Sequence, residues 1–353
     1  MRRRALLVAI VIAIGLLWQP FLYPAGKAAL LLLDIYSPVL LGSNIAALVT
    51  PEPRERESRE SLGGVEMRVS WWRPGWGDRH PGVMLVNGAT PVGNDNSATR
   101  LLGRALARAG YLVMLPEFPF LVEGRLDPDA PRVVDAAFGA LRALPETEGR
   151  PPGAVGASVG GGILLVAAGS ERNVTRADHV TVLGAYFDMD TYVASVATRS
   201  QGMPPAVLTP WEPSAEAAER IPPAVLAAMT DEQDRARVRA ALAAPSYEQA
   251  LQRLAELSPR GRAVFDRLSP STVWGSVVPP VFWIHDPDDS YEPLSEAYAA
   301  REAARQGRMV LIVPRLVQHA EPAGGVKGRG LLFVVGELLA LLGFTLEVLR
   351  LAG

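Results

Sequence analysis

The sequence has no cysteine, only four histidines and no excess of charge of either sign. The lack of cysteine excludes disulfide bonds, thiolate catalysis and cysteine-ligated metal sites. Four histidines without a His-x-x-x-His pair argue against a zinc site, so we expect no bound metal. The formal net charge is −2, with basic and acidic residues mixed, and this gives no support to a nucleic-acid partner.

The chain has 353 residues, 49% of them hydrophobic, enough for one large domain with an insertion or a tail. Three arginines at positions 2–4 precede an apolar run, Ala5–Trp18, which continues to Tyr23. That length barely spans a bilayer, and the arginines predict a cytoplasmic N-terminus. A cleaved signal peptide is the alternative, but no small-residue cleavage site follows the run. We therefore expect residues 1–50 to be a membrane-anchor region.

A second apolar stretch, Ala28–Val49, contains Asp34, Pro38 and Asn44. It is compatible with a second span, an interfacial helix or a segment that lies on the main domain. One span would put the domain outside the cytoplasm, and two would return it to the cytoplasm. The following run Pro51–Glu60 has no apolar residue, so we interpret 51–63 as a charged linker and 64–353 as the main domain.

Short apolar runs alternate with helix-like segments through the main domain. Helices are predicted at Ser97–Ala109, Arg132–Leu144 and Pro293–Gln306, where apolar residues recur at helical spacing. The predicted strands are Val65–Trp72 (as an edge strand), Gly82–Val86, Tyr111–Leu115, Gly153–Ala157, His179–Ala185, Pro280–Ile284 and Met309–Val313. This alternation predicts an α/β fold with a mostly parallel sheet covered by helices on both faces.

Two segments depart from this alternation. Residues 190–278 are rich in Pro, Ala, Arg and Glu and include helix-like pieces at Asp231–Ala243 and Tyr247–Leu257. We interpret them as a helical cap insertion, the alternative being a helical excursion without substrate contact. The last apolar segment, Gly330–Leu349, contains Glu337 and Glu347 and is predicted as a terminal helix on the sheet, or else as a membrane-associated helix.

The candidate nucleophile is Ser158, in Gly156-Ala157-Ser158-Val159-Gly160 between a predicted strand and a predicted helix. A Gly-x-Ser-x-Gly turn in this context is a nucleophile elbow: the serine is strained, and the glycines let strand and helix approach closely. The helix N-terminus favours negative charge, so the amide of Val159 is predicted to point at a developing oxyanion.

A serine nucleophile needs a base that a carboxylate orients. The loop after Pro280–Ile284 contains three aspartates, and the loop after Met309–Val313 contains His319. In this architecture acid and base follow the serine in that order. The other three histidines (His80, His179 and His285) precede or begin a strand or lie before the acid, so elimination leaves His319 as the base.

With these residues the chain resembles the α/β-hydrolase superfamily, specifically its bacterial dienelactone-hydrolase-like and prolyl-oligopeptidase-like esterase branch. The resemblance covers residues from about 64 to the C-terminus, without most of the insertion. The family pattern His-Gly-x-x-Asp-x-x-Val-Pro, laid on residues 285–293, implies Asp289 as the acid, although Asp286 replaces the usual glycine. Asp288 is a rival, and Asp188 and Asp190 are weaker alternatives.

The resemblance also implies a second oxyanion donor in the turn Asn87-Gly88-Ala89, where asparagine replaces the family's histidine. The donor is a backbone N–H, which we assign to Ala89, with Thr90 as the alternative. An ordinary tight turn is the competing interpretation.

These residues predict a membrane-anchored serine hydrolase that cleaves an ester or related acyl bond without a cofactor. The alternatives are an acyltransferase with the same triad and a membrane-tethered binding protein that keeps the fold. Tethering and an apolar insertion loosely favour a lipophilic small-molecule substrate.

Overall fold

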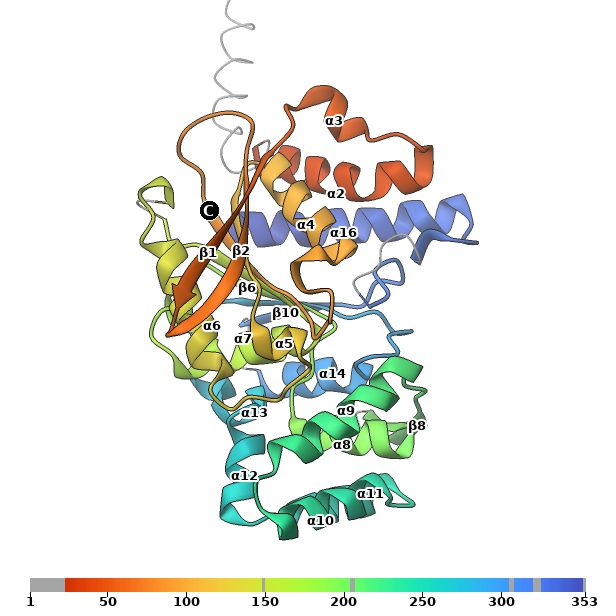
Figure 1. The fold of residues 1–353 in the computed structure, drawn as a ribbon. Coiled ribbons are helices and arrows are strands. Elements are labelled where there is room, and N and C mark those ends of the chain that lie inside the picture. Colours follow the sequence, from red (N-terminus) through yellow and green to blue (C-terminus); the bar gives the residue numbers. More distant parts are fainter. Residues whose placement is uncertain (1–22, 148–149, 204–206, 305–307, 320–324, 352–353) are drawn as a thin grey trace, which may run out of the picture.

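The protein is described by a computed structural model that covers residues 23–351 apart from 148–149, 204–206, 305–307 and 320–324 (Figure 1). The predicted anchor Ala5–Trp18 lies outside the described residues. A central sheet of eight strands has the order β1-β2-β4-β3-β5-β6-β9-β10, and from β4 to β10 all neighbours are parallel. The strands are β1 (Arg54–Leu62), β2 (Val65–Arg73), β3 (Gly82–Val86), β4 (Leu112–Pro116), β5 (Gly153–Ala157), β6 (Val180–Leu183), β9 (Val281–Ile284) and β10 (Met309–Ile312).

The parallel strands end together at one edge of the sheet. Val86 pairs with Gly156, Ala157 with Leu183, and Leu183 with Ile284. Loops that leave the carboxyl ends of these strands therefore meet, and in open α/β sheets this is where ligands bind.

Helices cover both faces of the sheet, as the alternating pattern predicted. Met84 and Val86 point into the core shared with α6 (Ala130–Arg142), α7 (Ser158–Ser170) and α14 (Leu294–Ala303). On the opposite face, Val83 and Leu85 belong to a core with α4 (Ser97–Arg108). Beside α4 lie α2 (Tyr23–Leu41) and α16 (Leu331–Leu351), which contact each other (Figure 1).

The predicted linker 51–63 is corrected by the structure, because residues 54–62 form β1, the edge strand of the sheet. Strand β1 pairs with β2 over its whole length, so β2 is not the edge strand that we expected. The hairpin turns at Gly63 and Gly64, whose φ angles of 61° and 82° suit a two-residue hairpin turn. Most side chains of β1 are exposed, and its alternating Arg and Glu protect an open edge from further strand pairing.

The apolar stretch 28–49 is divided between α2 and α3 (Ile45–Val49). Helix α2 lies on the domain: its Asp34 is fully buried, and one carboxylate oxygen is 2.9 Å from Nε of the equally buried Arg108 in α4. The side chain of Asn44 donates to the same oxygen at 2.6 Å. A buried ion pair to a neighbouring helix fits a segment that packs against protein on this side.

The insertion is helical, as expected, with one small hairpin. Its helices gather at the far end of the molecule from α2 and α16 (Figure 1). The elements are α8 (Met189–Thr198), β7 (Ser200–Met203), β8 (Val207–Pro210), α9 (Ala215–Ala228), α10 (Glu232–Leu242), α11 (Tyr247–Ala255), α12 (Pro259–Asp266), α13 (Pro270–Val273) and the short 3-10 turn Trp274–Ser276. Short helical elements elsewhere are α5 (Pro119–Val122) and the 3-10 turns Gly93–Asp95, Pro145–Thr147 and Val174–Arg176.

Candidate active site

The elbow residue Ser158 is held in a strained backbone between β5 and α7. Its φ of 53° lies in the left-handed region, which costs energy for any residue other than glycine. A Cβ on Gly160 would lie 2.0 Å from the carbonyl oxygen of Asn87, and one on Gly156 would lie 2.7 Å from Cα of Gly161. These contacts are with backbone atoms that cannot give way, so strand and helix approach this closely only with glycine.

The turn after β3 packs directly against the serine. A Cβ on Gly88 would lie 3.0 Å from Cβ of Ser158 and 3.5 Å from its Oγ. The N–H of Gly88 donates to the Asn87 side chain at 2.9 Å, which leaves Ala89 and Thr90 as the candidate oxyanion donors of this turn. Val159 occupies the second position of α7, where a backbone N–H has no partner within the helix.

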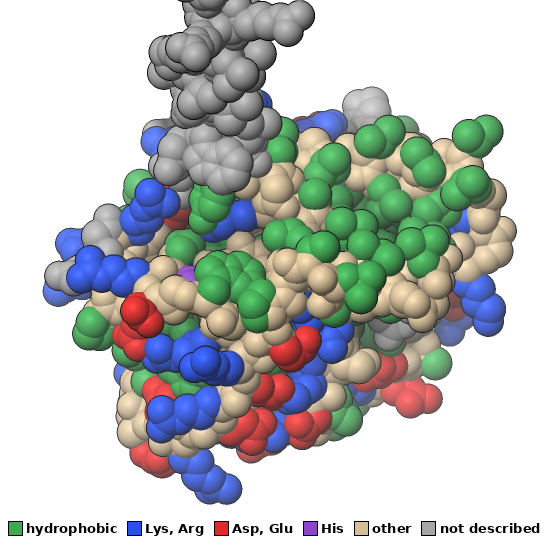
Figure 2. Space-filling model, turned by 90° about the horizontal axis from the view of Figure 1, so that it is seen from above, with side chains coloured by type: hydrophobic (Ala, Val, Ile, Leu, Met, Phe, Trp, Pro, Cys, Tyr) green, Lys and Arg blue, Asp and Glu red, His purple; other side chains and the backbone are tan. Residues whose placement is uncertain are grey.

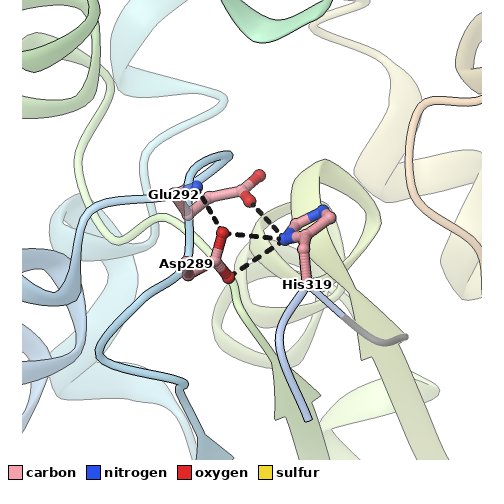
Figure 3. A group of neighbouring side chains, drawn as sticks. All are labelled: Asp289, Glu292 and His319. Atoms are coloured by element: carbon pink, nitrogen blue, oxygen red, sulfur yellow. Dashed lines mark hydrogen bonds and ion pairs between the residues drawn. The ribbon is translucent and has the colours of Figure 1, made fainter. Parts of the chain in front are cut away.

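The predicted acid and base lie in contact. Nδ1 of His319 is 3.1 Å from Oδ1 and 3.0 Å from Oδ2 of Asp289 (Figure 3). Burial acts to raise the pKa of Asp289, but the charge and hydrogen bond of His319 outweigh it and hold that pKa below its ordinary value. The rival Asp288 is exposed instead, with its carboxylate 3.6 Å from the guanidinium of Arg329.

The two weaker acid candidates have structural partners elsewhere. Asp188 caps α8, accepting hydrogen bonds from the amides of Asp190 and Thr191. Asp190 pairs with Arg262 of α12 at 2.8 Å. These bonds give both carboxylates a structural role at α8 and α12.

Asp286 ties the acid loop to the base loop, and His285 holds the acid loop itself in place. Oδ2 of Asp286 accepts the backbone N–H of Gln318 at 2.7 Å, next to His319. The fully buried His285 contacts the carbonyl of Glu292 through Nε2 at 2.9 Å, and its Nδ1 accepts from Trp283 at 3.3 Å. These partners assign His285 to a neutral tautomer, and burial lowers its pKa accordingly.

A residue that the sequence reasoning missed, Glu292, occupies the centre of the site. Its Oε1 accepts a hydrogen bond from the hydroxyl of Ser158 at 2.6 Å, and its Oε2 lies 3.1 Å from Nδ1 of His319 without hydrogen-bond geometry. Figure 3 shows Glu292 and Asp289, from one loop, facing the imidazole of His319. Glu292 has no exposed surface, and burial raises its pKa to about 8.

The insertion also reaches the site through α9. Nη1 of Arg220 donates to the carbonyl of Ala89 at 3.1 Å and pairs with Glu216 at 2.7 Å. Glu216 accepts in turn from the hydroxyl of Tyr291 at 3.0 Å, and the ring of Tyr291 stacks on that of His319 at 4.2 Å. A chain of contacts therefore joins the candidate oxyanion turn to the candidate base.

The three residues of Figure 3 could also receive a cation, because Asp289, Glu292 and His319 each offer one ligand atom within 4.8 Å of the others. Asp289 is already engaged, since its Oδ1 accepts the backbone N–H groups of Tyr291 at 2.8 Å and of Glu292 at 3.2 Å. These bonds orient the carboxylate towards His319, as a triad acid requires.

No protein-family model matches the sequence, and no curated protein matches it either. Among solved structures, the chain resembles a 2,6-dihydroxy-pseudo-oxynicotine hydrolase with a TM-score of 0.51 and 16% identity, over 84% of this chain and 68% of that one. It resembles an acylaminoacyl peptidase with a TM-score of 0.51 and 13% identity, over 81% of this chain but only 41% of that one. The dienelactone hydrolase from Anabaena variabilis has a TM-score of 0.46 and 17% identity, over 84% of this chain and 96% of that one. At these identities the likeness shows the fold, and the prediction of an α/β-hydrolase fold is confirmed.

Proposed function

We propose that this protein is a serine hydrolase that cleaves an ester or related acyl bond through an acyl-enzyme on Ser158. The observation that carries the proposal is a strained serine at the start of α7 whose hydroxyl donates to a buried carboxylate at 2.6 Å, beside a paired His319 and Asp289. A strained, hydrogen-bonded serine at a helix N-terminus is the arrangement that acyl transfer requires.

The proposed reaction begins with attack of Ser158 Oγ on the acyl carbonyl carbon. The hydroxyl proton moves to the basic cluster of Glu292 and His319, with Glu292 Oε1 as the first acceptor because it already holds that hydrogen bond. The negative oxygen of the tetrahedral intermediate is bound by the amides of Val159 and Ala89. The intermediate collapses, and the leaving alcohol takes the proton from the cluster.

The acyl-enzyme is then hydrolysed by water. The cluster removes a proton from the attacking water, the ester to Ser158 breaks, and Ser158 regains its hydrogen as the carboxylic acid leaves. Asp289 holds the imidazole of His319 in one tautomer throughout. No step needs a metal. We therefore expect turnover to be unchanged by a chelator, even though Asp289, Glu292 and His319 together could bind a cation.

We also propose that the domain sits against a lipid bilayer. Exposed apolar side chains of α2, α3 and α16 form a surface that we call the apolar face, consisting of Leu33, Val39, Leu40, Leu41, Leu48, Val49, Leu331, Leu332, Val335 and Leu339. Hydrophobic side chains gather over these helices in Figure 2. Two helices here, Tyr23–Leu41 and Leu331–Arg350, are long and apolar enough to cross a membrane. Large exposed apolar patches mark interaction sites, and a face on α2, the helix that follows the predicted anchor in the sequence, suits lipid.

The hydrolase proposal is tested by turnover of matched ester and amide substrates. We expect the wild-type protein to release acid from aryl esters, and Ser158→Ala to lose about 10⁴-fold or more. Faster cleavage of the amide than of the ester would assign the site to a peptidase. An added alcohol that diverts most product into a new ester would assign it to an acyltransferase. Equal rates for wild type and Ser158→Ala would exclude this site.

A further inference from the structure

An apolar cavity of about 130 Å³ lies behind the candidate site, between the sheet and the helices that carry the apolar face. Its helix walls include Leu31 and Leu32 of α2, Leu102 of α4 and Leu341 of α16. Its floor is made by residues near the carboxyl ends of the strands, including Leu183 and Ile284. The cavity therefore lies on the opposite side of the sheet from α6 and α7.

One end of the cavity touches the catalytic elements. Asn87, which begins the candidate oxyanion turn, lines it, and so does Ala157, the residue immediately before Ser158. Val317, two residues before His319, completes this end. The cavity thus abuts three of the segments that carry the proposed chemistry: the oxyanion turn, the elbow and the base loop.

The polar side chains at the end of the cavity next to the candidate site, Asn87 and Thr99, are already hydrogen-bonded. The side-chain amide nitrogen of Asn87 donates to the carbonyl of Gly93 at 2.8 Å, and its oxygen accepts the hydroxyl of Thr99 at 2.8 Å. These groups offer little to a polar ligand, so the cavity favours hydrocarbon. A dry cavity of roughly 150 Å³ lined by aliphatic side chains binds a benzene-sized molecule, which is about six carbons.

We propose that this cavity binds the apolar acyl chain of the substrate, with the acyl carbonyl at Ser158 and the chain directed towards α2 and α16. The inference rests on the proposed hydrolase function and adds a substrate class: esters with an unbranched or aromatic acyl group of about six carbons. The helices that close the cavity also carry the apolar face, so a substrate dissolved in lipid would start close to its binding site.

The test uses the full chain in lipid nanodiscs and a series of p-nitrophenyl esters from acetate to dodecanoate. Each methylene that leaves water for the cavity should raise kcat/KM about fourfold, until the cavity is full. Thr345→Phe in α16 fills the cavity and should lower the ratio of hexanoate to acetate kcat/KM about tenfold or more. Leu102→Ala enlarges the cavity and should move the optimum to a longer chain. Ala340→Phe, at an exposed position of α16 that does not line the cavity, is the matched control and should change neither the hexanoate-to-acetate ratio nor the optimal chain length.

The outcomes separate this inference from the function on which it rests. The acyl site is supported if Thr345→Phe shifts the preference to shorter acyl chains and Leu102→Ala shifts it to longer ones. Ester hydrolysis with an unaltered chain-length profile in both variants overturns the inference and leaves the hydrolase intact. Binding of hexanoate to Ser158→Ala protein, measured as a rise in Tm that Thr345→Phe abolishes, gives a readout that does not need turnover. If hexanoate does not raise the Tm, the acyl site is overturned, even if no ester is hydrolysed.

Discussion

At the scale of single residues, the site depends on a carboxylate that sequence reasoning did not select. The serine, His319 and Asp289 were predicted from the elbow, from elimination and from resemblance, but Glu292 was not. Its loop has acidic residues at 286, 288, 289 and 292, and no sequence pattern tells which of them turns towards a serine 134 positions away. Only the tertiary approach of two loops and α7 distinguishes them.

Glu292→Gln tests the role of this carboxylate as proton acceptor. Because burial raises its pKa to about 8, only its ionised form above that pH accepts a proton freely, and kcat/KM should rise through about pH 8. The amide should remove this rise and lower kcat/KM about a hundredfold or more, since it cannot take the proton. Glu296→Gln is the control, because Glu296 is equally buried but bonds to Thr191 and backbone amides. Full activity in Glu292→Gln would assign proton transfer to His319 alone.

The same pKa predicts how stability depends on pH. The folded protein holds the Glu292 proton more tightly than the unfolded chain, where the pKa is near 4.5. The contribution of Glu292 to stability is therefore present in full below about pH 4.5, falls as the pH rises to about 8, and is level above that. Glu296, whose pKa burial raises to about 7, acts in the same direction. Urea unfolding across this range should show the fall, weaker in Glu292→Gln and weaker still in the double variant.

The elbow glycines give a second test at residue scale. Gly160→Ala should lower the free energy of unfolding by about 3 kcal/mol or prevent folding, because its Cβ would meet the carbonyl oxygen of Asn87 at 2.0 Å. Gly336→Ala in α16 has nothing within 4 Å and should raise stability by up to about 1 kcal/mol through helix propensity. Thermal unfolding of the two variants measures both. Equal stability would mean that α7 and the turn after β3 are not as close as described.

At the scale of elements, the sequence predicted the parallel strands and their helices, with ends within a few residues. Buried parallel strands are continuous apolar runs, and Gly153–Ala157 was predicted with its observed bounds. Strand β1 was missed because both of its faces are largely solvated, so it has no apolar alternation. The local signal was the pair Gly63-Gly64, a two-residue hairpin turn ahead of β2.

Helix α9 of the insertion should matter for turnover more than for stability. Arg220→Met removes the guanidinium that fixes the carbonyl of Ala89 and pairs with Glu216, while it keeps an unbranched apolar stem. We expect kcat to fall about tenfold with little change in Tm, because part-exposed ion pairs contribute about 0–1 kcal/mol. Arg253→Met in α11, which removes an exposed pair with Glu256, is the matched control. An equal effect of both variants on kcat would contradict a role for α9 in positioning the oxyanion turn.

At the scale of the whole molecule, the described domain has one apolar face, which we propose docks on lipid, and a candidate site behind it. The alternation of strands and helices was enough to predict the fold, whereas the placement of α2 on the domain was not predictable from hydropathy. The charged Asp34 was the one sequence feature indicating that the stretch 28–49 packs against protein. Its partner Arg108 could not be predicted from sequence, because the pairing depends on how α4 packs against α2.

Contact of the apolar face with lipid can be measured directly, because the chain has no native cysteine to replace. A spin label at Leu332→Cys, on the apolar face, should be accessible to oxygen and protected from a water-soluble nickel chelate in nanodiscs. A label at Glu248→Cys, exposed in α11, should show the reverse. Equal access of the nickel chelate to both sites would contradict docking of this face on the bilayer.

The central claim is that Ser158 is an activated nucleophile, and the most direct measurement is covalent labelling by a fluorophosphonate followed by peptide mass mapping. The account predicts one adduct, on Ser158, that disappears in Ser158→Ala and slows sharply in Glu292→Gln and His319→Asn. Folded protein that takes up no label, or that is labelled at another serine, would contradict it.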